Sequence, residues 1–182
     1  MDNFIGYREV INTKKNLIII NSYPRSGKDT FANFLIKHLD NYNICGALVS
    51  SVEVVKECAT LMGWDGNKTE YNRDMLSSLK DWSSEWLDHP FKMMCDNADS
   101  LKPEEAIIYM IREPNEISRF KERYPETITI FIERDQHETA NNHADQNVND
   151  FNYDLRVENN RTLEQLEESA KQLVHNLFNK GE

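Results

Sequence analysis

A glycine and a lysine near the N-terminus form the part of this sequence that points most clearly to chemistry. Gly27 ends a turn-rich segment, residues 21–27, which follows a short apolar run, and Lys28 comes directly after it. Phosphate-binding loops have a glycine, four free residues and then Gly-Lys-Ser/Thr, because backbone N–H groups must encircle the phosphates while the lysine reaches the transferred group. The sequence therefore predicts a phosphate loop whose ATP-binding residues are Ser22, Tyr23, Pro24, Arg25, Ser26, Gly27, Lys28, Asp29 and Thr30.

Two positions of this loop depart from the usual pattern. Ser22 stands where the leading glycine belongs, and Asp29 stands where a Ser or Thr would hold magnesium. The carboxylate of Asp29 could ligate Mg²⁺, or Thr30 could take that task, and the sequence leaves both open. The alternative is a plain strand-to-helix turn in which Asp29 is a solvated first-turn acid. Two basic residues beside a glycine in one short loop favour phosphate binding.

Basic residues at predicted strand ends are further candidates, because phosphoryl transfer needs positive groups around the equatorial oxygens. Lys28 is predicted to bridge the phosphates of ATP, and Arg25 to reach these phosphates or the acceptor. Arg112 is predicted to clamp an acceptor phosphate, while Glu113 holds magnesium through water or orients the acceptor. Arg134 is predicted to neutralise the transition state. For these last three residues, a surface role is the alternative.

The predicted elements explain how these residues are positioned. Residues 17–20 form a β-branched run typical of a buried parallel strand, and helical spacing over 28–39 leads the loop directly into a helix. Further strands are predicted at 44–49, 106–111, 128–132 and 153–157, and further helices at 52–62, 71–87, 114–123 and 163–178. This alternation predicts a three-layer α/β fold with about five parallel strands, in which ligands bind beyond the carboxyl ends of the strands.

The domain organisation expected from this pattern is a single domain over residues 1–182. Residues 1–15 are interpreted as a loose leader, and the stretch between 87 and 106 as largely a polar connection. Residues 136–150 are rich in Asn, Asp and His and contain no Lys or Arg. Because long loops inside compact domains are usually functional, they are predicted to form a lid-like flap.

Composition narrows the function classes. A formal net charge of -10 and a pI near 5.0 disfavour a broad surface for DNA or RNA. Three dispersed cysteines form no disulfide framework and favour a reduced, cytoplasmic location. No apolar run approaches membrane-spanning length, so no membrane partner is expected. The two flap histidines, His137 and His143, are too isolated to predict a metal site.

The segment Arg-Ser-Gly-Lys-Asp-Thr at 25–30 resembles the phosphate loop of the phage deoxynucleoside monophosphate kinase family. The resemblance implies a P-loop kinase fold, ATP and Mg²⁺ as cofactors, a deoxynucleoside monophosphate as acceptor, and a location in the host cytoplasm. A homodimer is left open. The likeness continues more loosely through Ser51-Val52 with Lys56, Gly63-Trp64, Lys68, Arg73, Leu79-Lys80, Arg112-Glu113-Pro114, and residues 147–154 and 157–163.

The resemblance also implies roles for residues outside the loop. Residues 51–87 would be acceptor-binding helices, with Ser51, Lys68 and Arg73 contacting the acceptor beside Arg112 and Glu113. The adenine of ATP would lie near Asn159, Arg161 and Thr162. Arg161 stands where these kinases often have glycine, and the flap lacks the arginines that related lids supply.

Two other functions remain as alternatives. Phosphomevalonate kinases of the animal type also carry a Gly-Lys-Asp loop and look like the same superfamily, so a small-metabolite kinase is one. The arginine-poor flap suits a regulatory module that binds ATP without transferring phosphate, which is the other. The aromatic residues Trp64, Tyr71, Trp82 and Trp86 could stack on a base, but core packing is the favoured interpretation of that stripe.

Overall fold

The structure is a computed structural model, and it describes residues 4–5, 15–67, 69–135 and 147–179. The strands are β1 (Phe4–Ile5), β2 (Asn16–Ser22), β3 (Cys45–Ser50), β4 (Glu105–Met110), β5 (Ile128–Glu133) and β6 (Leu155–Glu158). The helices are α1 (Lys28–Leu39), the 3-10 turn η1 (Asp40–Tyr42), α2 (Glu53–Leu61), α3 (Glu70–Leu87), α4 (His89–Asp99), α5 (Pro114–Arg123) and α7 (Leu163–Phe178).

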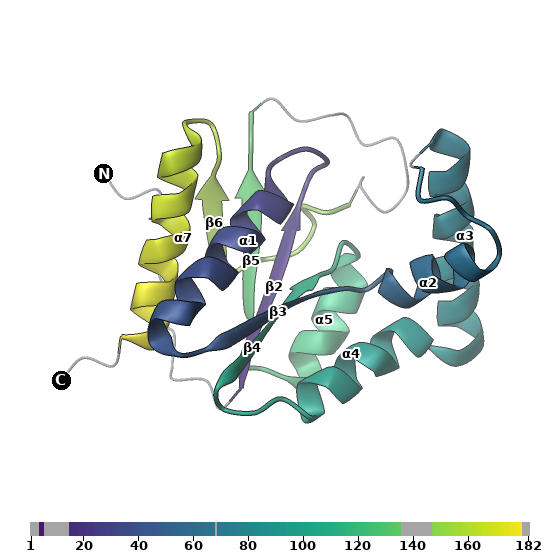
Figure 1. Cartoon of the computed structure of the whole chain (residues 1–182), viewed down its shortest axis with the longest axis horizontal. Coiled ribbons are helices and arrows are strands. Elements are labelled where there is room, and N and C mark those ends of the chain that lie inside the picture. The colour runs from purple at the N-terminus through teal and green to yellow at the C-terminus, as the bar shows by residue number, and fades with distance from the viewer. Residues whose placement is uncertain (1–3, 6–14, 68, 136–146, 180–182) are drawn as a thin grey trace.

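The six strands form one sheet in the order β1-β6-β5-β2-β4-β3, shown in Figure 1. β2 through β6 pair in parallel, which confirms the expected parallel sheet of five strands. β1 adds a short antiparallel strand beside β6. Residues 4–5 are therefore not part of a loose leader, as the sequence had suggested, while residues 6–14 lie outside the described part of the chain.

The strand order places the first long strand in the middle of the sheet. From β2 the chain goes to β3 at one edge, returns to β4, and then crosses β2 to reach β5 on the other side. The direction of winding therefore changes at β2. In sheets of this kind the crevice beyond the carboxyl ends at such a point is where ligands bind. The segment that follows β2 is the predicted phosphate loop.

Helices cover both faces of the sheet, as expected for three layers (Figure 1). Side chains alternate along β2, so Ile18 and Ile20 face one core and Leu17 and Ile19 face the other. The first core is covered by α1 and α7, and the second by α4 and α5. A capping box between Thr162 and Gln165 fixes the start of α7.

The helix α4 corrects the expectation of a polar connection after residue 87. The Asp88-His89-Pro90 sequence looks like a break, but proline fits the first turn of a helix, where its missing N–H has no partner to lose. Met94, Cys95 and Ala98 recur at helical spacing, and all three are buried. The spacing of these apolar residues was a signal for the helix. The many polar residues around them favoured a loop instead.

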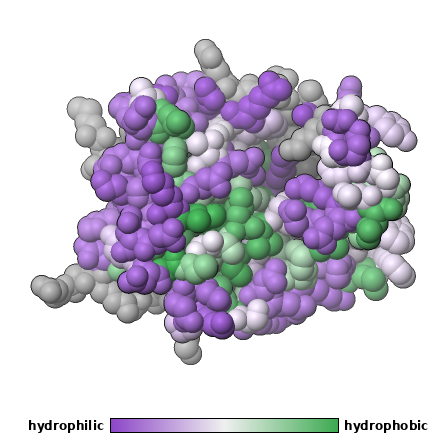
Figure 2. Space-filling model, in the orientation of Figure 1, coloured by the Kyte–Doolittle hydropathy of each residue, from purple (hydrophilic) through white to green (hydrophobic). Residues whose placement is uncertain are grey.

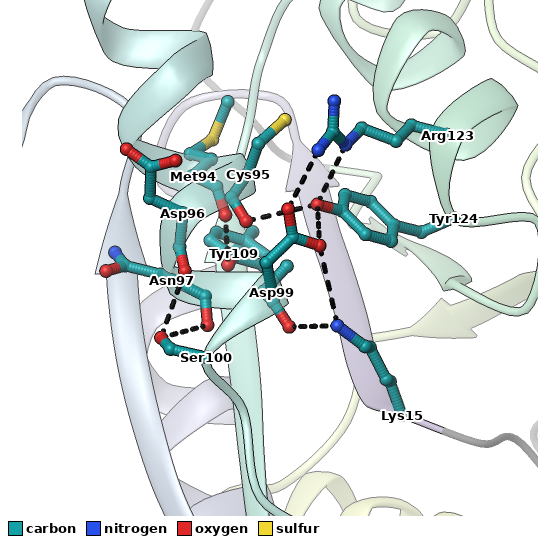
Figure 3. A network of polar contacts seen from close by, with 11 residues as sticks. Lys15, Met94, Cys95, Asp96, Asn97, Asp99, Ser100, Tyr109, Arg123 and Tyr124 are labelled. Carbon is teal, nitrogen blue, oxygen red and sulfur yellow. Dashed lines mark hydrogen bonds and ion pairs between the residues drawn. The ribbon is translucent and has the colours of Figure 1, made fainter.

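A polar network joins the end of α4 to α5 and to the start of β2, as Figure 3 shows. The hydroxyl oxygen of Tyr124 lies 2.8 Å from Asp99 Oδ1 and 3.1 Å from the carbonyl oxygen of Cys95, and these two acceptors share its single hydrogen. Arg123 and Lys15 both pair with Asp99, and Lys15 also donates to a carbonyl of α4. The bond from Lys15 thereby satisfies one of the last carbonyls of α4, that of Ala98, at the end of the sheet away from the predicted phosphate loop.

Strand β3 forms the exposed edge of the sheet. Figure 2 shows apolar side chains gathered in the middle of one face, where β3 lies in Figure 1. Cys45 and Ala47 are exposed, and Leu48 is 41% exposed. Among the described residues, no helix combines the length and apolar composition needed to cross a bilayer.

Candidate phosphate-binding site

The phosphate loop has a conformation suited to anions. Two of its residues are left-handed, with φ of 58° at Arg25 and 88° at Gly27, and the amide of Ser26 donates to the carbonyl of Tyr23 at 3.3 Å. Alternation of right- and left-handed residues makes a concave row of N–H groups that binds anions. The first helical bond of α1 runs from Phe31 N to Gly27 O, so the amides before it have no helical partner.

Gly27 is required by its surroundings as well as by its φ. A Cβ atom built there would lie 2.3 Å from the side-chain nitrogen of Asn159. That nitrogen donates to the carbonyl of Ser26 at 2.9 Å, and the backbone N–H of Asn159 donates to the backbone carbonyl of Glu133 at 2.7 Å. Asn159, beyond the end of β6, therefore braces the loop. Its predicted place beside adenine stays a prediction.

Lys28 is the loop's main cation, and its side chain is only 15% exposed. Its Nζ lies 3.4 Å from the sulfur of Met110, at the end of β4, and 3.4 Å from Asp29 Oδ1. Burial lowers the pKa of Lys28; the charge of Asp29 opposes this shift, and the charges of Arg112 and Lys56 add to it. The positive charges of Lys28, Arg112 and Lys56, which come from different elements, thus lie near the same end of the sheet.

Lys56 is a further cation whose charge contributes to the lowered pKa of Lys28, and the sequence assigned it no role. It lies in α2, which begins directly after β3, and its side chain is 34% exposed. The start of α2 is tied to β4 because Ser51 donates from both its backbone N–H and its hydroxyl to Met110 O, each at 3.4 Å. Ser51 is buried, so its hydroxyl would have to give up this bond to Met110 before it could contact an acceptor as predicted. The resemblance quoted Lys56, but only the fold shows that it acts on Lys28.

Arg112 and Glu113 follow β4, where the sequence placed them. Arg112 is exposed, and Glu113 precedes the first turn of α5. The carbonyl of Arg112 accepts a hydrogen bond from Asn21 at 3.0 Å. Asn21 was taken as part of a turn, yet it is a fully buried residue of β2. A polar residue ending an apolar strand was the available signal.

Arg134 contacts the phosphate loop directly. Its guanidinium donates to the carbonyl of Arg25 at 3.4 Å, although the two residues are far apart in sequence. The next residue, Asp135, donates its N–H to Asn160 Oδ1 at 2.8 Å. The base of the predicted flap is thereby held against the loop. Residues 136–146, including both flap histidines, lie outside the described residues.

The remaining predicted residues are less clearly brought together. Arg73 is exposed on α3, Arg161 is exposed before α7, and Lys68 lies outside the described residues. Thr162 caps α7, accepting from the N–H of Gln165 at 3.4 Å, which is a sufficient structural reason for a threonine there. Contacts of these residues with adenine or the acceptor stay predictions.

The aromatic stripe of α3 is not in the core, contrary to the favoured interpretation. Trp82 and Trp86 are 56% and 65% exposed, and Tyr71 is 79% exposed. Their rings lie on the outer side of a helix in which, over all its described residues, no side chain is fully buried. Trp64 is half-buried, and its indole N–H donates to the carbonyl of Asn67 at 3.0 Å. Helical spacing predicted the stripe but not which side faces the protein.

The donor set around the loop fits magnesium only together with phosphate. Asp29 offers one carboxylate that is 85% exposed, and Thr30 follows it in the first turn of α1. Among the described residues, no three His, Cys, Asp or Glu side chains gather as a metal cage. Mg²⁺ commonly takes one or two carboxylates plus waters and substrate phosphates, so one carboxylate beside a phosphate loop suits it.

Comparisons with known proteins add no assignment. No family model matches the sequence, and no curated protein matches it either. The functional argument therefore depends on the geometry described above.

Proposed function

We propose that this chain is an ATP-dependent kinase that transfers the γ-phosphoryl group of ATP to a deoxynucleoside monophosphate, giving ADP and the deoxynucleoside diphosphate. The observation that supports this most is the loop after the central strand. It combines left-handed residues at Arg25 and Gly27 with the largely buried ammonium of Lys28. A buried cation of lowered pKa beside a row of amides is suited to an anion with several charges.

The proposed chemistry is an in-line displacement. An oxygen of the acceptor's phosphate attacks the γ-phosphorus, the bond from phosphorus to the β–γ bridging oxygen breaks, and ADP leaves with that electron pair. Lys28 holds the ATP phosphates, while Arg112 and Lys56 hold the acceptor's phosphate. Arg134, which contacts the loop at Arg25, supplies positive charge near the transferred group. Positive groups that are already in place when the phosphates bind would need little reorganisation during transfer.

Magnesium would be held by Asp29 or Thr30, with Glu113 as a third candidate through water. When bound, Mg²⁺ would neutralise charge on the phosphate oxygens. Exclusion of water from the bound phosphates would favour transfer to the acceptor over hydrolysis.

The proposal is tested by measuring ADP release across the four deoxynucleoside monophosphates, phosphomevalonate and water alone. Transfer to one or more deoxynucleoside monophosphates is expected. Transfer to phosphomevalonate alone would identify a small-metabolite kinase. Tight ATP binding with no ADP release above background would identify a regulatory module.

The matched variants are Lys28→Ala and Lys171→Ala, since Lys171 is an exposed lysine of α7. Lys28→Ala should lower turnover by about 10³-fold or more, because a cation at the transferred group is lost. Lys171→Ala should leave turnover unchanged. Retained turnover in a folded Lys28→Ala protein, judged by circular dichroism, would contradict the assignment.

A further inference from the structure

Asn21 is a buried polar residue at a position that touches both halves of the proposed site. It is the second-last residue of β2, and none of its surface is exposed. A buried amide is costly unless its donors and acceptor are satisfied, and here they are. Its side-chain nitrogen donates to Arg112 O at 3.0 Å and to the hydroxyl of Tyr153 at 2.8 Å, and its oxygen accepts from Ser22 N at 2.9 Å.

The bond to Arg112 continues the pairing of two strands beyond its normal end. The register of β2 with β4 stops at Ile20 opposite Met110. One residue further along β2, the Asn21 side chain supplies the donor that a backbone N–H would have supplied. The chain leaving β4, which carries Arg112, is thereby held against the strand that carries the phosphate loop.

The other two bonds fix Asn21 itself. The bond from Ser22 N holds the entry to the phosphate loop. Tyr153 passes its own hydroxyl hydrogen to the carbonyl of Val148 at 2.6 Å, and its ring packs on Phe131 of β5 with centroids 4.9 Å apart. The amide is therefore held from two directions, and its position is set by packed groups.

We propose that Asn21 is a positioning residue that sets the separation between the phosphate loop and Arg112, and thus between donor and acceptor phosphates. This inference rests on the proposed function. Asn21 touches no substrate in this role; it acts through the backbone of Arg112 and of Ser22. A shift of about 1 Å between reacting groups lowers rates by about 10²-fold, so one amide is sufficient to matter.

The test is a double-mutant cycle on kcat/KM for the acceptor, using Asn21→Leu and Arg112→Ala singly and together. Leucine is close to asparagine in shape but makes none of the three bonds. Asn21→Leu should lower kcat/KM for the acceptor by about 30-fold or more, by the same misplacement argument. In the Arg112→Ala background, the same substitution should change kcat/KM by less than about threefold, because the guanidinium that Asn21 positions is gone, although its backbone carbonyl remains.

Tyr153→Phe is the matched control. It removes one of the bonds that hold Asn21 but keeps the ring and the bond from Asn21 to Arg112, so its effect on kcat/KM should be clearly smaller than that of Asn21→Leu. All assays run well below each variant's melting temperature, so that every variant is folded. A loss of stability alone would lower kcat/KM equally in both Arg112 backgrounds, whereas a loss of positioning would not. If Asn21→Leu does not fold, Asn21→Ser takes its place in the cycle.

The outcomes are separable. If the wild-type protein transfers phosphate to no phosphorylated acceptor, the proposed function fails and this inference fails with it. Suppose that the wild type transfers phosphate. If the fold-changes in kcat/KM from the two substitutions simply multiply in the double variant, or if Asn21→Leu is as active as the wild type, only the inference is overturned. It is also overturned if neither Asn21 variant folds, because Asn21 would then be needed for folding alone.

Discussion

The two sides of the proposed site are built differently. The donor side is the phosphate loop with α1, where Phe31, Leu35 and Leu39 are completely buried against the sheet. The proposed acceptor side consists of α2 and α3, which we call the arm (Glu53–Leu61 and Glu70–Leu87). In the arm only Val55 and Ala59 are buried among the described residues.

The arm is joined to the rest of the protein mainly at its edges. Lys80 of α3 pairs with Glu116 of α5 at 3.1 Å, and Arg119 of α5 binds Asp88, just after α3, with both guanidinium nitrogens. Helices with few buried apolar contacts open at low free-energy cost. The difference teaches that the loop after β2 rests on a well-packed helix, whereas α2 and α3 are loosely packed. If the proposed function is right, the donor site is preformed and ligand binding orders the arm on the acceptor side.

The largest expected contrast is between one aromatic residue of the body and one of the arm. Phe120→Ala removes a ring that is completely buried between α4, α5 and β4, and it should lower the free energy of unfolding by about 3–5 kcal/mol. Trp86→Ala removes a ring that is 65% exposed and should cost less than about 1 kcal/mol. Urea unfolding measures both, and equal costs would remove the distinction between body and arm.

A second contrast uses two left-handed glycines. Gly27→Ala meets both a positive φ and the Asn159 side chain, so it should cost more than about 2 kcal/mol and abolish ATP binding. Gly63→Ala, at the end of α2, meets a positive φ but nothing within 4 Å, so it should cost about 1–2 kcal/mol from backbone strain alone. Scanning calorimetry measures the loss of stability, and titration calorimetry measures ATP binding. ATP binding by Gly27→Ala at the wild-type level would contradict the proposed loop.

The polar tether of the arm gives the third prediction. The side chains of Lys80 and Glu116 are only 13% and 11% exposed, and burial raises the pKa of Glu116 although Lys80 opposes the shift. Lys80→Met leaves this carboxylate without its partner and should cost about 1–2 kcal/mol at pH 7. Because the pKa of Glu116 would rise further, that loss should shrink as pH falls and the carboxyl group is protonated.

The control for the tether is the double variant Lys80→Met/Glu116→Gln. Glutamine carries no charge, so most of the lost stability at pH 7 should return. If the double variant is as unstable as Lys80→Met alone at every pH, the ion pair is not what holds α3 to α5.

The smallest predicted effect is a gain in stability when Lys28 is replaced by an uncharged residue. Burial lowers the pKa of Lys28 from its ordinary value near 10.5, so its charge opposes folding of the ligand-free protein. Lys28→Met should raise the free energy of unfolding by about 1 kcal/mol at pH 7, whereas Lys171→Met should not. The unfolded chain binds more protons than the folded one between the lowered pKa and the ordinary value, so wild-type stability should rise with pH there. Lys28→Met should lack that rise in thermal melts.

Local signals were sufficient for much of the fold. The bounds of α1 and α7 agree with the predicted ranges 28–39 and 163–178, because each combines helical periodicity with a clear start. The parallel sheet followed from alternation of elements. Strand β1 was not predicted, since two residues carry no periodicity and their pairing with β6 is a long-range contact.

The site was predictable only where one segment carries it. The predicted phosphate loop is one continuous segment, so a sequence pattern alone groups its residues. Asn21 was not found, because its partners Arg112 and Tyr153 are 91 and 132 positions away in the chain. Lys56 likewise acts on Lys28 only through the pairing of β3 with β4. The exposure of Trp82 and Trp86 depends on which side of α3 meets α4, and periodicity does not specify that.

The sequence contains three tryptophans, Trp64, Trp82 and Trp86, and all three lie in the arm or in the turn between its two helices. The last two rings are neighbours, with centroids 5.0 Å apart. Intrinsic indole emission from this protein therefore reports on the arm and on no other part of the chain. A stopped-flow trace excited at the indole band would follow any movement of the arm after nucleotides are added, without an attached dye.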